Sequence, residues 1–240
     1  MTLLDTLRAA GLTARITVAT VAEALVKEVP PEVVDERLRW WARAVLREGR
    51  ITLHVRGVEN IPQDEALVVM SNHRSYYDIP AAYASIPGRI RMVAKKELFR
   101  VPLFGRAMRQ NGFIRVDRGD RSSAVESLNA SKKLLAEGTR VWIAPEGTRS
   151  KDGSLGKFKS GGFHLALDAG VRILPMVVEG TEAIMAHDSF VVNQGGTVHV
   201  TILPPVDAPA YGRERRKELM HDVREAMETV LRNTQQATGD

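Results

Sequence analysis

The chain contains no cysteine, and this absence excludes a whole group of functions. Without a thiol there is no cysteine nucleophile, no cysteine-bound zinc and no thiol redox chemistry. Any catalysis must therefore use other side chains. The absence leaves the compartment open, because a protein without cysteine is compatible with every redox environment.

Long uncharged segments are also absent. The longest stretch without Asp, Glu, Lys or Arg is Ser189–Val206, and glycine and proline residues interrupt it. Near the N-terminus, the apolar segment Leu12–Val29 is broken by Arg15, Glu23 and Lys27 and lacks the pattern of a secretory leader. We therefore expect a cytosolic protein that is neither secreted nor membrane-spanning.

The composition that remains is that of a folded globular protein. The chain has 240 residues, of which 44% are hydrophobic and 26% charged. These values exclude disordered and collagen-like chains, and no low-complexity linker divides the sequence. We expect one domain at residues 51–240. A helical extension at residues 1–50 precedes it and either lies against a membrane or packs on the protein's own core.

Positive charge is concentrated in one segment. The whole chain has a net charge of +5, whereas Arg89–Arg121 contains ten basic and three acidic residues and so carries +7. This concentration is typical of a protein that binds nucleic acid, a phosphorylated small molecule or an acidic membrane surface. A solvated basic face without a ligand is the alternative. Only 5% of the residues are aromatic, which disfavours nucleic acid, because bases stack on aromatic rings.

Hydrophobic periodicity predicts helices at both ends of the chain and alternating strands and helices between them. Residues 32–48 combine an apolar stripe with a second stripe of arginines, Arg39, Arg43, Arg47 and Arg50, so we expect an amphipathic basic helix. Further helices are expected at about 123–138 and 213–232. Strands are expected at Ile51–Val55, Ala66–Met70, Ile90–Ala94, Phe113–Val116, Val141–Ala144, Ile173–Val178 and Thr197–Leu203. This alternation indicates an α/β fold with a central, mainly parallel sheet flanked by helices.

The segment after the strand at 66–70 carries the first candidate chemistry. His73 precedes Asp78 by five residues, a spacing that places the two side chains on different faces of a regular helix. They meet only if the segment curls as a turn before the helix that Pro80 opens. The carboxylate would then hold one ring nitrogen and leave the other as a general base. A structural histidine or a helix cap explains the same spacing, and two ligands are too few for a metal site.

Two more loops follow strands that we expect to end at the same edge of the sheet. Arg118 follows the strand at 113–116, and Pro145–Ser150 follows the strand at 141–144. In an open α/β sheet the ligand crevice lies beyond the carboxyl ends of the strands. Two guanidinium groups, at Arg118 and Arg149, with backbone donors nearby suit a phosphate.

Together these segments resemble the four ordered motifs of the glycerolipid acyltransferase family. The matching residues are Asn72-His73 with Asp78, Gly112–Arg118, Pro145–Ser150 and Leu174–Val178, with further similarity at Lys95–Phe99, Pro102–Gly105 and Gly156–Gly161. The similarity covers roughly residues 57–181 and is greatest to the 1-acylglycerol-3-phosphate acyltransferases. It implies a glycerol-3-phosphate acyltransferase-like fold. It also implies transfer of a fatty acyl group to the free hydroxyl of lysophosphatidic acid, giving phosphatidic acid for phospholipid biosynthesis.

The resemblance further implies a role for each matching residue. His73 would be the general base and Asp78 its orienting partner. The residues that bind or order the phosphate end of the acceptor would be Arg118, Glu146, Gly147, Thr148 and Arg149, and the supporting residues would be Asn72, Gly112, Pro145, Lys159 and Pro175. A thioester is already activated, so a base and an oxyanion stabiliser suffice. We therefore expect no metal or other cofactor and no covalent enzyme intermediate.

The implied partners are a lysophospholipid acceptor, acyl-CoA or acyl carrier protein as donor, and an anionic membrane surface, without nucleic acid. Other interpretations stay open. The same motifs serve acyl transfer to glycerol-3-phosphate, to other lysophospholipids and to lipoamino acids. A basic nucleic-acid-binding or catalytically silent lipid-binding protein is the non-enzyme alternative. A P-loop is excluded, because Phe158 follows Lys157 where Ser or Thr is required, and no G-x-S-x-G motif supports a serine hydrolase.

Overall fold

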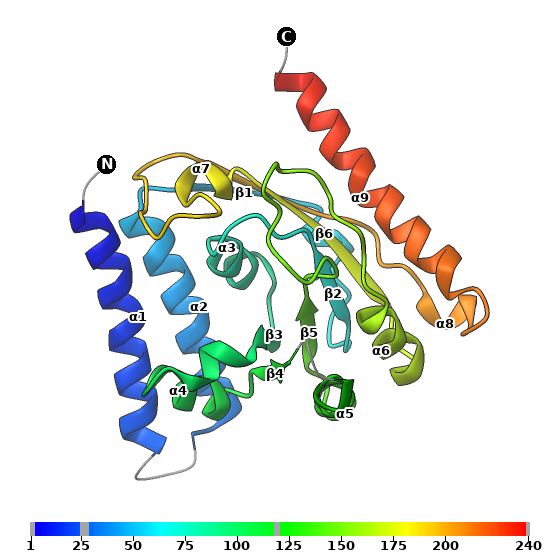
Figure 1. The fold of residues 1–240 in the computed structure, drawn as a ribbon, viewed down its shortest axis with the longest axis horizontal. Coiled ribbons are helices and arrows are strands. Elements are labelled where there is room, and N and C mark those ends of the chain that lie inside the picture. Colours follow the sequence, from blue (N-terminus) through cyan, green and yellow to red (C-terminus); the bar gives the residue numbers. More distant parts are fainter. Residues whose placement is uncertain (1–2, 25–28, 118–120, 239–240) are drawn as a thin grey trace.

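The computed structural model describes residues 3–24, 29–117 and 121–238 (Figure 1). The helices are α1 (Leu3–Ala24), α2 (Pro31–Glu48), α3 (Asp78–Ser85), α4 (Phe104–Gln110), α5 (Arg121–Ala136), α6 (Gly161–Ala169), α7 (Thr181–Ile184), α8 (Ala208–Tyr211) and α9 (Arg216–Thr238), with short 3₁₀ helices at Val58–Asn60 and Lys96–Arg100. The strands are β1 (Thr52–Arg56), β2 (Val68–Ser71), β3 (Ile90–Lys95), β4 (Ile114–Val116), β5 (Arg140–Ile143), β6 (Ile173–Glu179) and β7 (Thr197–Ile202). Every strand expected from the sequence is present, and its ends agree to within two residues.

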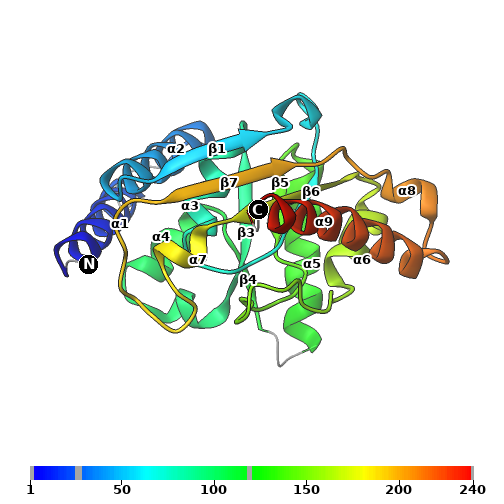
Figure 2. The ribbon, with the colours of Figure 1, turned by 90° about the horizontal axis from the view of Figure 1, so that it is seen from above.

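The strands form one sheet in the order β1-β7-β6-β2-β5-β3-β4 (Figures 1 and 2). Every neighbouring pair is parallel except β6 and β7. Strands β2 and β5 lie side by side in the middle of the sheet, and the connection that leaves each one skips a strand. The expected α/β fold with a central, mainly parallel sheet is therefore confirmed.

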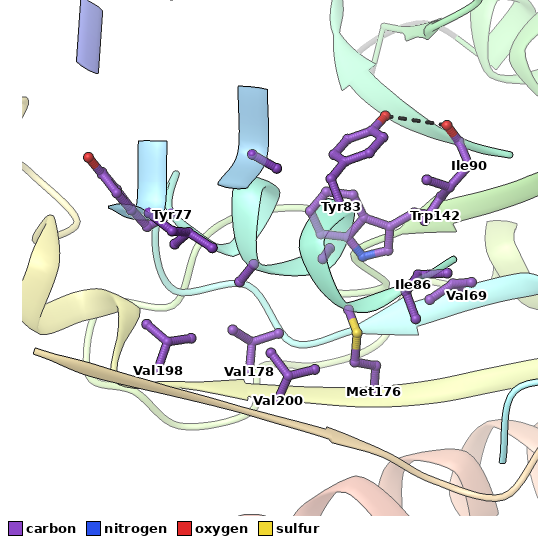
Figure 3. Packing of buried hydrophobic residues seen from close by; sticks show 14 of the residues in the cluster. Val69, Tyr77, Tyr83, Ile86, Ile90, Trp142, Met176, Val178, Val198 and Val200 are labelled. Atoms are coloured by element: carbon purple, nitrogen blue, oxygen red, sulfur yellow. Dashed lines mark hydrogen bonds between the residues drawn. The ribbon is translucent and has the colours of Figure 1, made fainter. Parts of the chain in front are cut away.

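Helices cover both faces of the sheet, and β2 shows how its residues divide between them. Val69 joins the core beneath α2 and α3, which Figure 3 shows from close by, whereas Val68 and Met70 join the core beneath α5, α6 and α9. This alternation follows from the two-residue period of a strand. Helix α3 follows β2 on one face of the sheet, and α6 follows β5 on the other face. The β2–α3 and β5–α6 loops therefore diverge beyond the strand ends and leave a crevice between them.

The sheet separates between β3 and β5. Their pairing runs from Ile90↔Arg140 to Met92↔Trp142 and ends there. Strand β3 nevertheless continues to Lys95 in pairing with β4, and β5 continues to Ile143 in pairing with β2. The two strands consequently leave a gap between them toward their carboxyl ends, which we call the sheet split.

Helix α2 belongs to the folded core as well as carrying surface charge. Val34, Leu38 and Val45 are buried in the core that α2 shares with α3 and the sheet, while Arg43 and Arg47 of the expected arginine stripe are exposed. The division of the chain into residues 1–50 and 51–240 stays a prediction. Within the part of the chain that is described, no helix has both the length and the hydrophobicity to cross a membrane.

A buried ion pair joins α2 to β3. Asp35 and Arg91 are 8% and 4% exposed, and Arg91 Nη1 donates to Asp35 Oδ1 at 2.5 Å. Arg89 Nε lies 3.4 Å from the other carboxylate oxygen. Removing one partner of such a pair leaves a buried charge without compensation, which is strongly destabilising.

We expect Asp35→Ala to lower the free energy of unfolding by about 3–5 kcal/mol, because Arg91 would stay buried without its carboxylate. Glu32→Ala is the matched control, since Glu32 pairs with Arg89 at the surface and its loss should cost less than about 1 kcal/mol. Urea denaturation of the two variants measures both values. Equal losses would show that the buried pair does not hold α2 on the sheet.

Candidate active site

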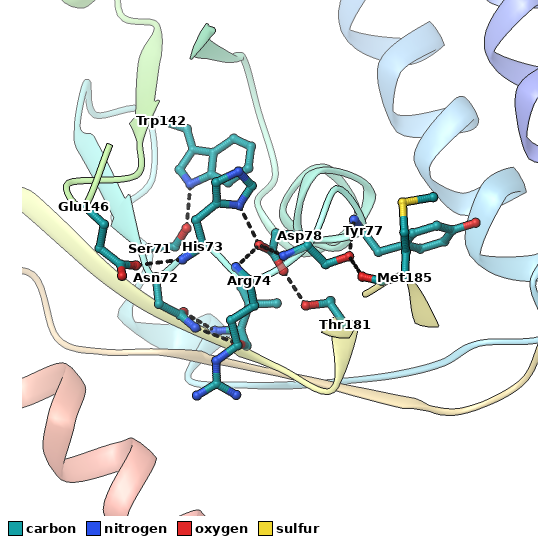
Figure 4. A network of polar contacts seen from close by, with 12 residues as sticks. Ser71, Asn72, His73, Arg74, Tyr77, Asp78, Trp142, Glu146, Thr181 and Met185 are labelled. Atoms are coloured by element: carbon teal, nitrogen blue, oxygen red, sulfur yellow. Dashed lines mark hydrogen bonds and ion pairs between the residues drawn. The ribbon is translucent and has the colours of Figure 1, made fainter. Parts of the chain in front are cut away.

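The turn that follows β2 brings His73 and Asp78 together. His73 Nδ1 lies 2.7 Å from Asp78 Oδ2, and Asp78, the first residue of α3, is completely buried. The chain curls between them because Asp78 N–H donates to the Ser75 carbonyl and Tyr77 N–H donates to the Ser75 hydroxyl. The segment therefore adopts the curled turn that the His-Asp spacing requires (Figure 4).

The carboxylate of Asp78 accepts hydrogen bonds from four groups. Oδ2 accepts from the His73 ring and from the backbone N–H groups of Arg74, at 2.7 Å, and Ser75, at 3.0 Å. Oδ1 accepts from the hydroxyl of Thr181 at 2.5 Å. Thr181 is completely buried and follows β6 directly. Sequence analysis missed this residue, and its one signal was a hydroxyl just beyond a strand end.

Side chains next to His73 anchor the turn to the two strands that flank β2. The Asn72 amide donates to the Val178 carbonyl at 2.7 Å and accepts from the Val178 N–H at 2.8 Å, which joins the turn to β6. On the other side, the indole N–H of Trp142 in β5 donates to the Ser71 hydroxyl at 2.8 Å. The position of His73 is thus set by three adjacent strands, as Figure 4 shows.

Glu146 ties the loop after β5 to the same turn. Its Oε1 accepts the N–H of His73 at 3.0 Å, and its Oε2 accepts the N–H of Gly156 at 2.7 Å. A Cβ at position 156 would lie 2.8 Å from that oxygen, so no larger residue fits there without a shift. Burial raises the pKa of Glu146, and the two N–H donors partly offset this increase. Both oxygens of Glu146 are therefore engaged by the backbone.

Two cations lie in the loops around the turn. The guanidinium of Arg149 stacks 4.0 Å from the centroid of the Tyr76 ring. The side chain of Lys159 packs over Gly147, where a Cβ would lie 3.0 Å from Nζ, and the φ of +73° at that glycine also disfavours any other residue. No carboxylate of the described residues forms an ion pair with Lys159. Thr148, which directly precedes Arg149, is exposed.

The remaining sequence-predicted residues differ in their positions. Pro145 lines the same cavity as His73. Pro175 pairs with Met70 inside the sheet. Gly112 precedes β4 and lies against the side chain of Arg91, so neither Pro175 nor Gly112 is placed beside His73. Arg118 lies outside the described residues.

Two cavities border the turn. The first has a volume of about 540 Å³, lies at the sheet split, and is lined by His73, Gly147 and Lys159 together with residues of β3, β5 and α5. The second has a volume of about 760 Å³ and is enclosed by α1, α2, α3 and α4, with Tyr76 and Tyr77 in its wall. Met92 lines both cavities. In the described part of the chain, no cluster of three His, Asp or Glu residues could hold a metal ion.

Residues 52–179, just over half of the chain, match the family model described as Acyltransferase. The chain belongs to the acyltransferase family. The matched part of this acyltransferase runs from β1 to the end of β6 and therefore includes the turn with His73 and the loop with Glu146. Helices α1 and α2 precede it, and α7 to α9 follow it.

Several curated relatives of this acyltransferase carry the name 1-acyl-sn-glycerol-3-phosphate acyltransferase. A chloroplastic protein of Arabidopsis thaliana is 37% identical over 64% of this chain and 43% of its own length. The alpha protein of Mus musculus is 33% identical over 76% and 64%, and the Escherichia coli protein is 34% identical over 68% and 66%. The chain thus spans about two fifths to two thirds of the length of these relatives.

A solved structure resembles this acyltransferase over nearly its whole length. The crystal structure of a 1-acyl-sn-glycerophosphate acyltransferase from Thermotoga maritima has a TM-score of 0.80, covers 96% of both chains and is 24% identical in sequence. At this identity the likeness shows a shared fold.

The pKa of Glu146 leads to a prediction about stability. Because this pKa is raised above its ordinary value of 4.5, the folded protein binds the proton more tightly than the unfolded chain does. The stabilisation is fully present below the ordinary value and is lost as the pH rises through the folded pKa. In the Glu146→Gln variant, the glutamine side chain has no proton to release in this pH range. We therefore expect its free energy of unfolding, measured in urea, to fall less than that of the unaltered protein between about pH 4 and about pH 8.

Glu225→Gln is the matched control for this measurement, because Glu225 lies on the exposed side of α9. Its unfolding free energy should follow the unaltered protein across the same pH interval. A pH dependence of Glu146→Gln identical to that of the control would contradict the prediction.

Proposed function

We propose that the chain is an enzyme that transfers a fatty acyl group from acyl-CoA or acyl carrier protein to the hydroxyl of 1-acylglycerol-3-phosphate, producing phosphatidic acid for phospholipid biosynthesis. Membership of the acyltransferase family supports the reaction class, and the names of the relatives support the acceptor. The observation that carries the proposal is the contact of His73 Nδ1 with the buried Asp78 carboxylate, beside a cavity.

The first step that this geometry favours is removal of the acceptor's proton. With Nδ1–H held by Asp78, the ring keeps the tautomer in which Nε2 has a free electron pair. Nε2 of His73 then takes the proton of the glycerol hydroxyl as its oxygen attacks the thioester carbonyl. The carboxylate stabilises the resulting imidazolium, and its own position is fixed by Thr181, Arg74 and Ser75.

The second step returns the proton. The tetrahedral intermediate collapses, the carbon–sulfur bond breaks, and the departing thiolate takes the proton from His73 Nε2, so the enzyme regains its starting state. A thiolate is a good leaving group, which is why the chemistry requires neither a covalent acyl-enzyme nor a metal or other cofactor. The chain has no cysteine to form such an intermediate by thiol exchange.

The acceptor's phosphate is assigned to the cations around the turn. Lys159 pairs with none of the carboxylates that the structure describes, and it lies over Gly147 in the cavity that His73 lines. Arg149 and the exposed Thr148 come from the same loop and supply further donors. Arg118 keeps the phosphate-binding role that the family resemblance implies. Glu146 orders these loops through its bonds to backbone N–H groups.

The donor's acyl chain is assigned to the cavity among α1, α2, α3 and α4. In the described part of the chain its polar lining groups are tyrosine and threonine hydroxyls, the Asn111 amide and the Trp41 indole N–H, without any Asp, Glu, Lys, Arg or His, and the rest of the lining is apolar. Burying a fatty chain there is favourable by about 0.8 kcal/mol for each methylene group. The second cavity thus suits the part of the donor that carries no polar group beyond the thioester.

The outer face of α2 suits a peripheral position on an anionic membrane surface, on its cytoplasmic side. Arg39, Arg43 and Arg47 line one shallow cleft of about 280 Å³ together with Trp40, whose side chain is 43% exposed. Basic side chains beside an exposed tryptophan are typical of helices that lie in the headgroup region. A substrate drawn from the bilayer would reach the enzyme from this side.

We expect His73→Ala to lower the rate of acyl transfer by about 10²–10⁴-fold, the usual contribution of a general base. The assay measures thiol release from palmitoyl-CoA, with lysophosphatidic acid, glycerol-3-phosphate, another lysophospholipid and no acceptor in parallel. His221→Ala, an exposed histidine on α9, should retain full activity. A near-normal rate for His73→Ala would contradict the mechanism, and absence of acceptor-dependent release with both acyl-CoA and acyl carrier protein would contradict the function.

Thr181 should act through Asp78 as a positioning residue. We expect Thr181→Val to lower kcat by about tenfold, since a hydrogen bond to a charged group contributes about 1.5–3 kcal/mol, while KM for both substrates stays unchanged. Thr181→Ser keeps the hydroxyl and should restore kcat. A change in thermal midpoint without a change in kcat would assign Thr181 a structural role alone.

A further inference from the structure

The cavity at the sheet split has two kinds of lining, and their arrangement follows the fold. His73, Gly147 and Lys159 belong to loops beyond the strand ends. The side chains on the strands and on α5 are mainly apolar: Val93 of β3, Val116 of β4, Leu128 of α5 and Ile143 of β5. The cavity is therefore polar and cationic where the loops meet and apolar where it enters the gap between β3 and β5.

The polar residues within the apolar wall are already engaged by the protein. The hydroxyl of Ser127 is within hydrogen-bond distance of the carbonyls of Ser123 and Arg115, to which its one hydrogen can be donated, and the hydroxyl of Ser131 donates to the carbonyl of Ser127. Asp117 forms an ion pair with Lys96. Lys159, in contrast, has no acidic partner among the described residues, so the unsatisfied charge of this cavity is positive.

The second cavity differs from the first in the charge of its lining, and the acyl chain of the donor differs from the acceptor in the same respect. None of the described residues that line the second cavity carries a charged side chain, which suits the donor's acyl chain, a hydrocarbon beyond the thioester. The acceptor instead combines a phosphate, a reactive hydroxyl and a fatty chain within a few bonds of one another. Met92 lines both cavities, so two chains lying in them would meet beside the same turn.

We propose that the sheet split holds the acceptor's own acyl chain, with the acceptor's phosphate at Lys159 and its hydroxyl at His73. This inference rests on the proposed function. It follows from the position of His73, which lines this cavity. The hydroxyl to be acylated is on the carbon next to the one that bears the existing chain, so a hydroxyl at His73 brings that chain to the same cavity. The volume of about 540 Å³ is in the range of cavities that bind small amphiphilic ligands. The gap between β3 and β5 is thus a lipid-binding feature of the sheet.

Filling either cavity tests the assignment. Leu128→Trp narrows the split, and Ala9→Phe in α1 is the matched variant that narrows the second cavity. Both are assayed with hexanoyl and oleoyl forms of lysophosphatidic acid as acceptors and with decanoyl-CoA and palmitoyl-CoA as donors. We expect Leu128→Trp to raise KM for the oleoyl acceptor about tenfold, equivalent to losing about two buried methylene groups, with the hexanoyl acceptor and the donor preference unchanged.

Ala9→Phe should give the converse result, with preference shifted toward decanoyl-CoA and unchanged KM for both acceptors. A shift of donor preference in Leu128→Trp would overturn the proposal, because it would place the donor chain in the split. Unchanged kinetics in a folded Leu128→Trp protein would overturn it as well. Leu128→Phe, a smaller change, should alter KM in the same direction if Leu128→Trp does not fold. Failure of the unaltered chain to acylate any acceptor would count against the proposed function itself.

Discussion

The burial of the Asp78 carboxylate is the constraint on which the functional end of the sheet depends. An ionised carboxylate without exposed surface is tolerated only where hydrogen-bond donors replace water. Here the donors come from the His73 ring, from the backbone of the turn and from Thr181 beyond β6. The same four bonds that satisfy the carboxylate also fix the imidazole, the curl of the turn and the start of α3. The hydrogen bonds that replace water around the carboxylate therefore also position the base.

The charged groups that the structure describes in the site favour binding of an anion, because the carboxylates have partners within the protein and the cations do not all have them. The described carboxylates around the site are engaged by the protein: Asp78 and Glu146 accept hydrogen bonds on both oxygens, and Asp117 forms an ion pair with Lys96. The cation Lys159 has no such partner among the described residues, and the Arg149 guanidinium lies on an aromatic ring, where one face is occupied but hydrogen-bonding groups remain. Among the described residues, a ligand that enters the site thus meets unpaired cationic donors, whereas the carboxylates already have partners.

Much of the fold could be predicted from local sequence patterns, because strand burial and helix amphipathicity depend on residues that are close together in the sequence. The buried runs that became β5 and β6 and the arginine-striped helix α2 are examples. The His73–Asp78 turn was also predictable, since both partners lie within one short segment. Thr181, the Trp142 bond to Ser71 and the sheet split were not, because each depends on which strands become neighbours, and the strand order β6-β2-β5-β3 brings together segments about 100 residues apart.

Gly112 shows what a motif alone leaves open. It lies in a motif that resembles a family signature, yet the structure places it at the amino end of β4 against Arg91 rather than beside His73. A residue in such a motif can pack against a neighbouring side chain without lying beside the proposed base. Glu146 is similar in kind: its carboxylate holds two loops together, and its location in a conspicuous motif says little about whether it faces a substrate.

The ion pair between Asp35 and Arg91 connects the basic helix to the cavities. Arg91 is followed directly by Met92, the residue that lines both cavities, and Asp35 lies on α2, the helix that carries the exposed arginines. One buried charge pair therefore joins the helix proposed to face the membrane to the strand that separates the two cavities.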